Sequence, residues 1–150
     1  MHSSIIWQKA VRFLIFGIYH AILSRVLLPP IRVWMLRLAG ASVGTHCVIH
    51  NVHFDNLYHY GFSKIAIGNS CFIGDEALFD ARGGITLEDH VTISNRVALL
   101  THINVGYSNH PLQTAYPTAE RAVTVKRGAY IATGAIVLPG ITIGEESVVG

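Results

Sequence analysis

The stretch VKRGAYIATGAIVLPGITIGEESVVG, residues 125–150, decides the fold, because a large apolar side chain returns at every sixth residue. These residues are Val125, Ile131, Val137, Ile143 and Val149. A period of six fits neither the 3.6-residue repeat of an α-helix nor the two-residue alternation of a half-buried strand. We therefore treat the chain as a repeat protein before assigning any single element.

The same spacing extends upstream through most of the chain beyond Gly40. The earlier large apolar positions are Val43, Ile49, Ile67, Ile73, Phe79, Leu87, Ile93 and Leu99. Four residues after most large positions comes a second, smaller one, occupied by Cys47, Cys71, Ala77, Val91, Val97, Ala129, Ala135 and Ser147. The interval from Ile49 to Ile67 is a multiple of six, so the phase survives an irregular stretch.

This pattern predicts an all-β solenoid over residues 41–150. Each six-residue unit forms one short strand and one tight turn, and three units close a triangular coil. The large residue points into the prism and the small one fills the space beside the corner. Each coil buries its apolar side only against the next coil, so several coils are needed for stability.

Residues 1–40 form a separate, helical extension in this prediction. Residues 5–28 are long enough to cross a bilayer but contain scattered basic side chains. Four polar residues are spaced at multiples of four residues, which places them in a narrow stripe along one face of a helix. They are Gln8, Arg12, His20 and Ser24. The helix is expected to end at Pro29-Pro30. The sequence leaves three roles open for this helix: it could lie on a membrane surface, pack into an oligomer or span a membrane.

Composition excludes some partners. A net charge of +2 without a run of basic residues does not indicate nucleic-acid binding. Cys47 and Cys71 both fall on the small inward position, so we expect buried structural thiols rather than a disulfide. Such cysteine usage fits a reducing compartment, and we expect a cytoplasmic protein, on the inner face of the membrane if residues 5–28 contact lipid.

The repeat is interrupted where catalytic residues are most expected. Between Leu99 and Val125 the chain is polar, contains proline and carries two histidines, which predicts a loop protruding from the prism at about residues 101–124. A histidine at the mouth of a loop on a rigid scaffold is a good candidate for a general base.

At this point the sequence resembles a known family. Both GAYIATGAIVLPGITIGEESVVG (Gly128–Gly150) and DARGGITLEDHVTISNRVALLTH (Asp80–His102) look like segments of the hexapeptide-repeat O-acetyltransferases of the maltose, galactoside and exopolysaccharide type. The resemblance implies a left-handed parallel β-helix, against the usual right-handed crossover rule. It also implies transfer of an acetyl or similar acyl group from acyl-CoA to a hydroxyl of a sugar or polysaccharide precursor, by a homotrimer.

The resemblance suggests roles for particular residues. His102, in Thr101-His102, matches the family's general base, although it lies three residues after Leu99 where several members have five. His110, in Asn109-His110-Pro111, is therefore a rival. Asp80 is expected to hold the acceptor or orient the histidine, and Asn95 and Asp75 are weaker candidates for acceptor binding.

Coenzyme A is expected in the groove between neighbouring prisms of the trimer. By resemblance this groove is lined by Tyr130, Ala132, Thr133, Gly134 and Gly150. Tyr130 and Ala132 stand where the family usually has tryptophan and glycine. The sequence stops within a repeat, so we expect a copy that lacks its last coil.

Two alternatives belong to other functional classes. A β-helix can be a scaffold without catalytic activity, because fold does not determine function. The nine histidines also raise a zinc-dependent, carbonic anhydrase-like enzyme, in which His46, His50, His53, His59 and His90 would be considered. Because a catalytic zinc needs three converging ligands and the spacing does not provide them, we expect no metal.

Overall fold

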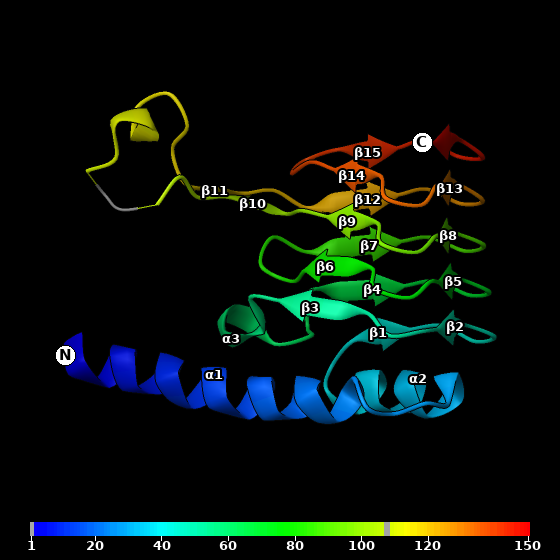
Figure 1. The fold of residues 1–150 in the computed structure, drawn as a ribbon, viewed down its shortest axis with the longest axis horizontal. Coiled ribbons are helices and arrows are strands. Elements are labelled where there is room, and N and C mark those ends of the chain that lie inside the picture. The colour runs from blue at the N-terminus through cyan, green and yellow to red at the C-terminus, as the bar shows by residue number, and fades with distance from the viewer. Residues whose placement is uncertain (1, 107–108) are drawn as a thin grey trace.

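The chain folds into a three-sided prism that stands on two helices (Figure 1). The structure is a computed structural model that describes residues 2–106 and 109–150. The first sheet contains β1 (Ser42–Val43), β4 (Ile65–Ile67), β7 (Ile85–Leu87), β12 (Val123–Val125) and β15 (Thr142–Ile143). The second contains β2 (Val48–Ile49), β5 (Phe72–Ile73), β8 (Thr92–Ile93), β13 (Tyr130–Ile131) and β16 (Val148–Val149). The third contains β3 (His53–Asp55), β6 (Leu78–Asp80), β9 (Ala98–Leu99) and β14 (Ile136–Val137).

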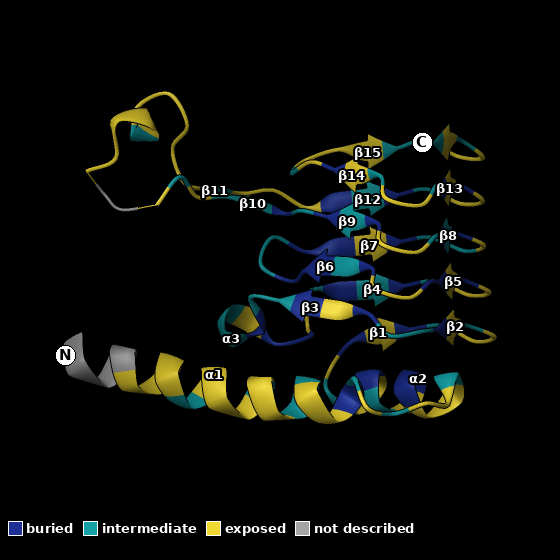
Figure 2. Ribbon diagram, in the orientation of Figure 1, coloured by how far each residue is buried: buried dark blue, intermediate teal, exposed yellow. Residues whose placement is uncertain are grey.

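Strands within each sheet are parallel, and their register follows the six-residue period. Ile67 pairs with Leu87, and Leu87 pairs with Val125, so equivalent repeat positions stack directly above one another. These side chains are buried and form the core (Figure 2). The fold prediction, a left-handed parallel β-helix with an N-terminal helix, is confirmed.

The corners of the prism are held by ladders of Asn and Asp side chains. Asp75 Oδ1 accepts a hydrogen bond from Asn51 N at 3.2 Å, and Asn95 Oδ1 accepts one from Asp75 N at 3.0 Å. A second ladder runs through Asn69 and Asp89. Each carboxylate or amide oxygen thus satisfies a backbone N–H of a neighbouring coil, which a tight turn would otherwise leave unpaired.

The N-terminal extension is two helices rather than one, and the first ends before the predicted boundary at Pro29-Pro30. The first helix, α1 (His2–Leu23), ends before the prolines, and the second, α2 (Pro29–Leu38), begins at Pro29. Proline is compatible with the first helical position because the N–H it lacks would have no intrahelical partner there. The same chemistry that ends a helix therefore begins one here.

Helix α1 lies across the base of the prism, with α2 continuing along it (Figure 1). Its buried side packs on the first coil: Leu23 is buried, and His20 Nε2 accepts a hydrogen bond from Phe54 N at 3.2 Å. The side that faces away is apolar and exposed (Figure 2). Among the helices of the described residues, none combines the length and apolarity required to cross a bilayer.

Two segments leave the regular coils on the same side of the prism. A short helix, α3 (Leu57–Tyr60), follows β3 and contacts α1. Between β9 and β12 the chain runs outward as an antiparallel hairpin of β10 (His102–Ile103) and β11 (Ala119–Glu120), with a 3₁₀ turn, η1 (Pro111–Gln113), near its tip (Figure 1).

The two cysteines are both free but differ in exposure. Cys71 is buried, whereas Cys47 is partly exposed, so the expectation of two buried thiols holds only for Cys71. Burial raises the pKa of the Cys71 thiol to about 11. We expect iodoacetamide at pH 8 to label Cys47 in the native protein and Cys71 only after denaturation, because the thiolate is the reactive form. Peptide mass spectrometry would detect this, and equal native labelling would contradict it.

Candidate active site

An Asp-His pair lies where the hairpin leaves the prism. Asp80, at the end of β6, and His102, at the start of β10, are joined by a 2.5 Å contact between Asp80 Oδ2 and His102 Nδ1. Asp80 is 1% exposed, whereas a quarter of the His102 side chain is exposed. The pair therefore has a buried anchor and an accessible imidazole, which is the arrangement a general base requires.

Asp80 is held by hydrogen bonds from three directions. Asn56 Nδ2 donates to Asp80 Oδ1 at 2.9 Å, and Thr101 N donates to Asp80 Oδ2 at 2.9 Å. The Thr101 hydroxyl donates to the Asp80 carbonyl at 2.8 Å, which fixes the strand as well as the carboxylate. Burial alone would raise the pKa of Asp80, but the bonds from His102, Thr101 and Asn56 outweigh it and lower the pKa below its ordinary value.

The hydrogen bonds distinguish the two candidate histidines. Because Asp80 is an ionised acceptor, it selects the tautomer in which His102 carries its proton on Nδ1, and the Nε2 lone pair is then available for a proton. His110 has the opposite arrangement, because its Nδ1 accepts a hydrogen bond from Leu112 N at 3.1 Å. Neutral His110 therefore carries its proton on Nε2, and it lies exposed beside η1 rather than against a carboxylate.

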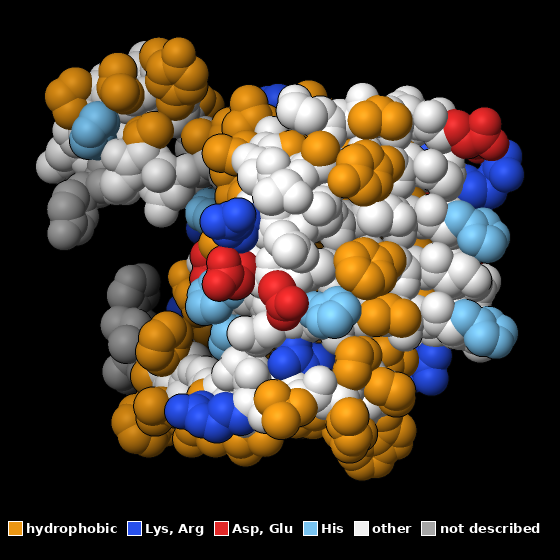
Figure 3. Space-filling view, turned by 45° about the vertical axis from the view of Figure 1, so that its right-hand side comes forward, with side chains coloured by type: hydrophobic (Ala, Val, Ile, Leu, Met, Phe, Trp, Pro, Cys, Tyr) orange, Lys and Arg blue, Asp and Glu red, His pale blue; other side chains and the backbone are white. Residues whose placement is uncertain are grey.

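Charged residues lie beside the Asp80–His102 pair, in a surface region that we call the entrance. Glu120 lies opposite His102 across the hairpin, and its carboxylate accepts a 2.9 Å hydrogen bond from Arg82 Nε. Lys64 Nζ lies 3.8 Å from the same carboxylate. Figure 3 shows charged and histidine side chains gathered on the side of the prism between the hairpin and the N-terminal helix. Asp80 was proposed from the sequence, whereas Arg82 and Glu120 were not, because neither occupies a diagnostic repeat position.

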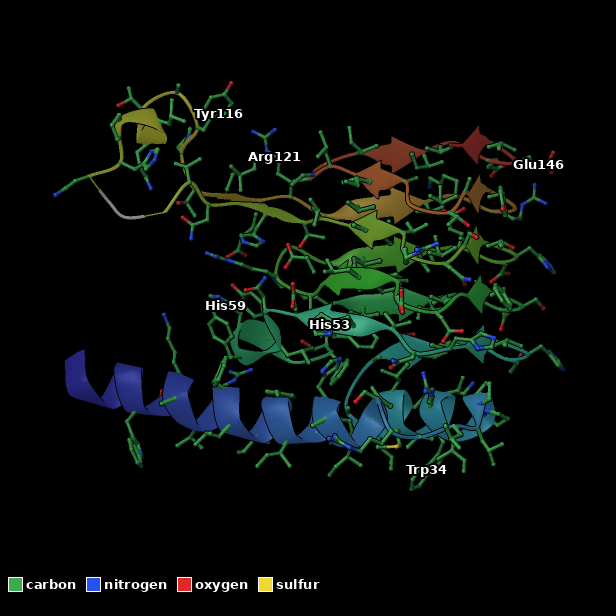
Figure 4. All side chains as sticks on the ribbon, viewed as in Figure 1. Trp34, His53, His59, Tyr116, Arg121 and Glu146 are labelled. Atoms are coloured by element: carbon green, nitrogen blue, oxygen red, sulfur yellow. The ribbon has the colours of Figure 1, made fainter. Side chains whose placement is uncertain are left out.

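His59 on α3 also belongs to this entrance (Figure 4). Its Nε2 is buried and lacks a hydrogen-bond partner among the described residues. Burial lowers the pKa of His59, the nearby Arg82 cation lowers it further, and Glu120 opposes the decrease. Because this nitrogen is buried, His59 borders the site but presents no ring nitrogen at its surface. The sequence placed His59 among possible metal ligands, not at this entrance.

The other acceptor-binding candidates lie elsewhere in the hydrogen-bond network. Asn95 and Asp75 belong to the corner ladder, where their side-chain oxygens accept bonds from backbone N–H groups. The structure connects neither residue to His102. Their predicted role in acceptor binding stays a prediction, while their bonds within the ladder account for their presence at the corner.

The residues expected to bind coenzyme A cluster on β13 and the turn after it. Tyr130, Thr133 and Gly134 are exposed, and Thr133 Oγ1 lies 2.7 Å from Ser94 Oγ in the coil below. Ala132 N donates to Val149 O in the next coil, which places Ala132 beside Gly150. Small residues at this corner leave the backbone open to a ligand, although contact with coenzyme A stays a prediction.

Nine histidines raise the question of a metal site. Within the described residues, no three His, Cys, Asp or Glu side chains are grouped so that they could hold a metal ion. His53 and His50 instead lie beside Asp55 and Asp75, respectively.

The lowered pKa of Asp80 predicts how stability depends on pH. A carboxylate with a depressed folded-state pKa stabilises the protein above the unfolded-state value of about 4 and loses that contribution as the pH falls toward the folded-state value. We expect the free energy of unfolding of the wild type to fall more steeply below about pH 4 than that of Asp80→Asn. Urea unfolding between pH 3 and 6 measures both, and parallel curves would contradict this.

Comparison with solved structures shows which known proteins share this fold. The fold is that of hexapeptide-repeat acetyltransferases of known structure. The hexapeptide-repeat acetyltransferase VCA0836 from Vibrio cholerae superposes with a TM-score of 0.76 at 21% identity, covering 93% of this chain and 76% of that one. VCA0836 in complex with acetyl coenzyme A gives 0.74 at 20% identity, covering 93% and 73%. Galactoside acetyltransferase in complex with coenzyme A gives 0.75 at 20% identity, covering 93% and 68%.

Two relatives are similar to this chain in sequence and are, like the proteins above, named as acetyltransferases. WcaF of Escherichia coli K12, named as a colanic acid biosynthesis acetyltransferase, is 31% identical over 119 residues, which cover 79% of this chain and 60% of that protein. WcaF of Shigella flexneri matches equally. No family model matches the chain. The chain thus spans 60% of the length of these relatives. The resemblance to the hexapeptide-repeat O-acetyltransferases is confirmed by these matches.

Proposed function

We propose that this protein is an acyl-CoA-dependent O-acetyltransferase that acts on a hydroxyl of a sugar or polysaccharide precursor. The observation that carries the proposal is the contact between buried Asp80 and partly exposed His102, at the foot of the hairpin. Family resemblance, fold and the names of the relatives support the same reaction class. A scaffold would not require a buried carboxylate that fixes the tautomer of an accessible histidine.

The proposed reaction needs one proton acceptor. His102 Nε2 removes the proton from the acceptor hydroxyl, and the oxygen attacks the thioester carbonyl of acetyl-CoA. Collapse of the tetrahedral intermediate breaks the carbon–sulfur bond, and the proton on His102 passes to the departing thiolate. Asp80 stabilises the imidazolium formed in between, because its carboxylate lies against Nδ1.

We place the acceptor at the entrance lined by His59, Arg82 and Glu120. Arg82 and Glu120 offer a hydrogen-bond donor and an acceptor within one small region, which suits the several hydroxyls of a sugar. Asp80 has its oxygens committed to Asn56, Thr101 and His102, so we assign it to orienting the histidine rather than to holding the acceptor.

For coenzyme A we propose the corner formed by Tyr130, Ala132, Thr133, Gly134 and Gly150. In the described chain this corner is an open surface rather than an enclosed pocket. A second prism would supply the opposite wall, so the proposal includes a homotrimer in which each groove lies between two copies. Sedimentation equilibrium should therefore show three copies in the active species.

The proposal is tested by acetyl-CoA binding and transfer. Calorimetry should detect acetyl-CoA binding by the wild type, His102→Ala and His110→Ala. Release of free thiol in the presence of a panel of sugars should then be lost only in His102→Ala. Absence of acetyl-CoA binding in all three folded proteins would contradict the proposal and favour a scaffold.

A further inference from the structure

The outward faces of α1 and α2 form one apolar surface, which we call the basal surface. Its large exposed side chains are Trp7, Leu14, Ile15, Ile18, Ile22, Leu27, Leu28, Ile31, Trp34 and Leu38. Figure 3 shows hydrophobic side chains gathered along the lower edge of the molecule, over these helices. A continuous apolar area of this kind on a folded protein marks a surface that contacts something other than water.

Helix α1 carries apolar side chains on its packed side and on its outward side, unlike an ordinary surface helix. In a surface helix the apolar stripe packs on the core and the polar stripe faces water. Here Phe16, Tyr19 and Leu23 pack on the core, while Leu14 and Ile18 on the other side are 62% and 61% exposed. Packing within the chain therefore does not account for the apolar residues on the outward face.

Charge is distributed so that this end of the chain suits an anionic partner. Residues 1–54 contain five Lys and Arg residues and no Asp or Glu. The remaining six Lys and Arg residues and all nine carboxylates lie in residues 55–150, which therefore carry a net charge of −3. Three of the five basic residues, Lys9, Arg12 and Arg25, are exposed and lie on α1 or in the turn after it. Cations around an apolar helix face favour binding to anionic lipid.

Both tryptophans of the chain lie on the basal surface. Trp7 is 71% exposed and Trp34 is 59% exposed. In Figure 4 the Trp34 side chain points away from the prism. Tryptophan is unusual on a water-facing surface but is enriched where a protein meets the interfacial region of a bilayer, because its ring is apolar and its N–H is polar.

We propose that the basal surface binds an anionic lipid bilayer, with α1 and α2 lying in the plane of the interface. A second copy of the chain is a poorer occupant, because two such cationic ends would repel each other. The inference goes beyond the acetyl-transfer proposal and does not depend on it.

Vesicle binding tests the proposal directly. Purified protein is mixed with phosphatidylcholine vesicles, with or without 30 mole percent phosphatidylglycerol (roughly the anionic content that favours polybasic surfaces). We expect binding to anionic vesicles that is about tenfold stronger than to neutral ones and that weakens as salt is raised. Tryptophan emission should shift to shorter wavelength on binding, because both tryptophans would enter a less polar environment. Equal, negligible binding to both vesicles would overturn the proposal.

A pair of variants distinguishes vesicle binding through the basal surface from non-specific hydrophobic binding. Leu14→Glu/Ile18→Glu places two carboxylates on its centre and should reduce binding to anionic vesicles about tenfold or more. Leu138→Glu changes a side chain of similar exposure, 58%, near the opposite end of the prism and should bind like the wild type. Equal loss in both variants would overturn the proposal.

The alternative occupant has its own outcome in the same experiment. If the basal surface joined two copies, Leu14→Glu/Ile18→Glu would lower the sedimenting mass and the wild-type protein would not bind vesicles. This result would refute lipid binding. Circular dichroism establishes that the variants fold. The wild-type salt and lipid dependence decides the question even if the double variant does not fold.

Discussion

His102→Ala is expected to lower kcat for acetyl transfer by about 10²–10⁴-fold, the usual contribution of a general base. The variant removes the Nε2 lone pair but leaves the proposed coenzyme A corner on β13 untouched, so acetyl-CoA affinity should stay within about twofold. Steady-state release of free thiol, together with calorimetry, measures the two effects separately.

His110→Ala is the matched control for this substitution. His110 lies on the same hairpin loop but carries its proton on Nε2, because Nδ1 accepts a bond from Leu112 N. Its removal should change kcat by less than about threefold. If His110→Ala lost activity and His102→Ala kept it, the assignment of the base would be reversed.

Asp80→Asn is expected to produce a loss of similar size, about 10²–10⁴-fold in kcat, through the tautomer of His102. An amide N–H directed at Nδ1 would make that nitrogen the acceptor and move the imidazole proton to Nε2, where it blocks proton removal from the acceptor hydroxyl. Acetyl-CoA affinity should again be preserved. Proton NMR should show the Nδ1–H signal of His102 in the wild type and its loss in the variant.

Asp89→Asn provides the control for the change from carboxylate to amide. Asp89 Oδ1 accepts a bond from Asn69 N at a corner of the prism, and asparagine retains that oxygen. We expect wild-type kcat from Asp89→Asn. If Asp80→Asn kept wild-type kcat while losing the Nδ1–H signal, the positioning role of Asp80 would be wrong.

The coil architecture could be predicted from the sequence because each repeat position has one environment. Residues such as Ile73, Ile93 and Ile131 all point into the same prism, so burial imposes the same requirement at six-residue intervals. A period of this kind is independent of distant contacts. It therefore survives in a single sequence without knowledge of the packing.

The surroundings of the site could be predicted only in part. Asp80 and His102 follow in-phase residues, which drew attention to both. Asn56 and His59 come from the irregular segment after β3, and Glu120 comes from the returning strand of the hairpin, where no period constrains position. The two helices were also misjudged as one, because proline has the same effect on the sequence pattern whether it follows a helix or begins one.

The hairpin that leaves the prism after β9 returns without disturbing the stack. Ile85–Leu87 of β7 pair directly with Val123–Val125 of β12, although the whole excursion lies between them in the chain. Insertions or deletions at the tip of this arm therefore leave the coil register intact. His102 stands at the foot of the arm, so evolution can remodel the arm while the proposed general base keeps its place. The arm and the residues at its foot can therefore change at different evolutionary rates within one gene.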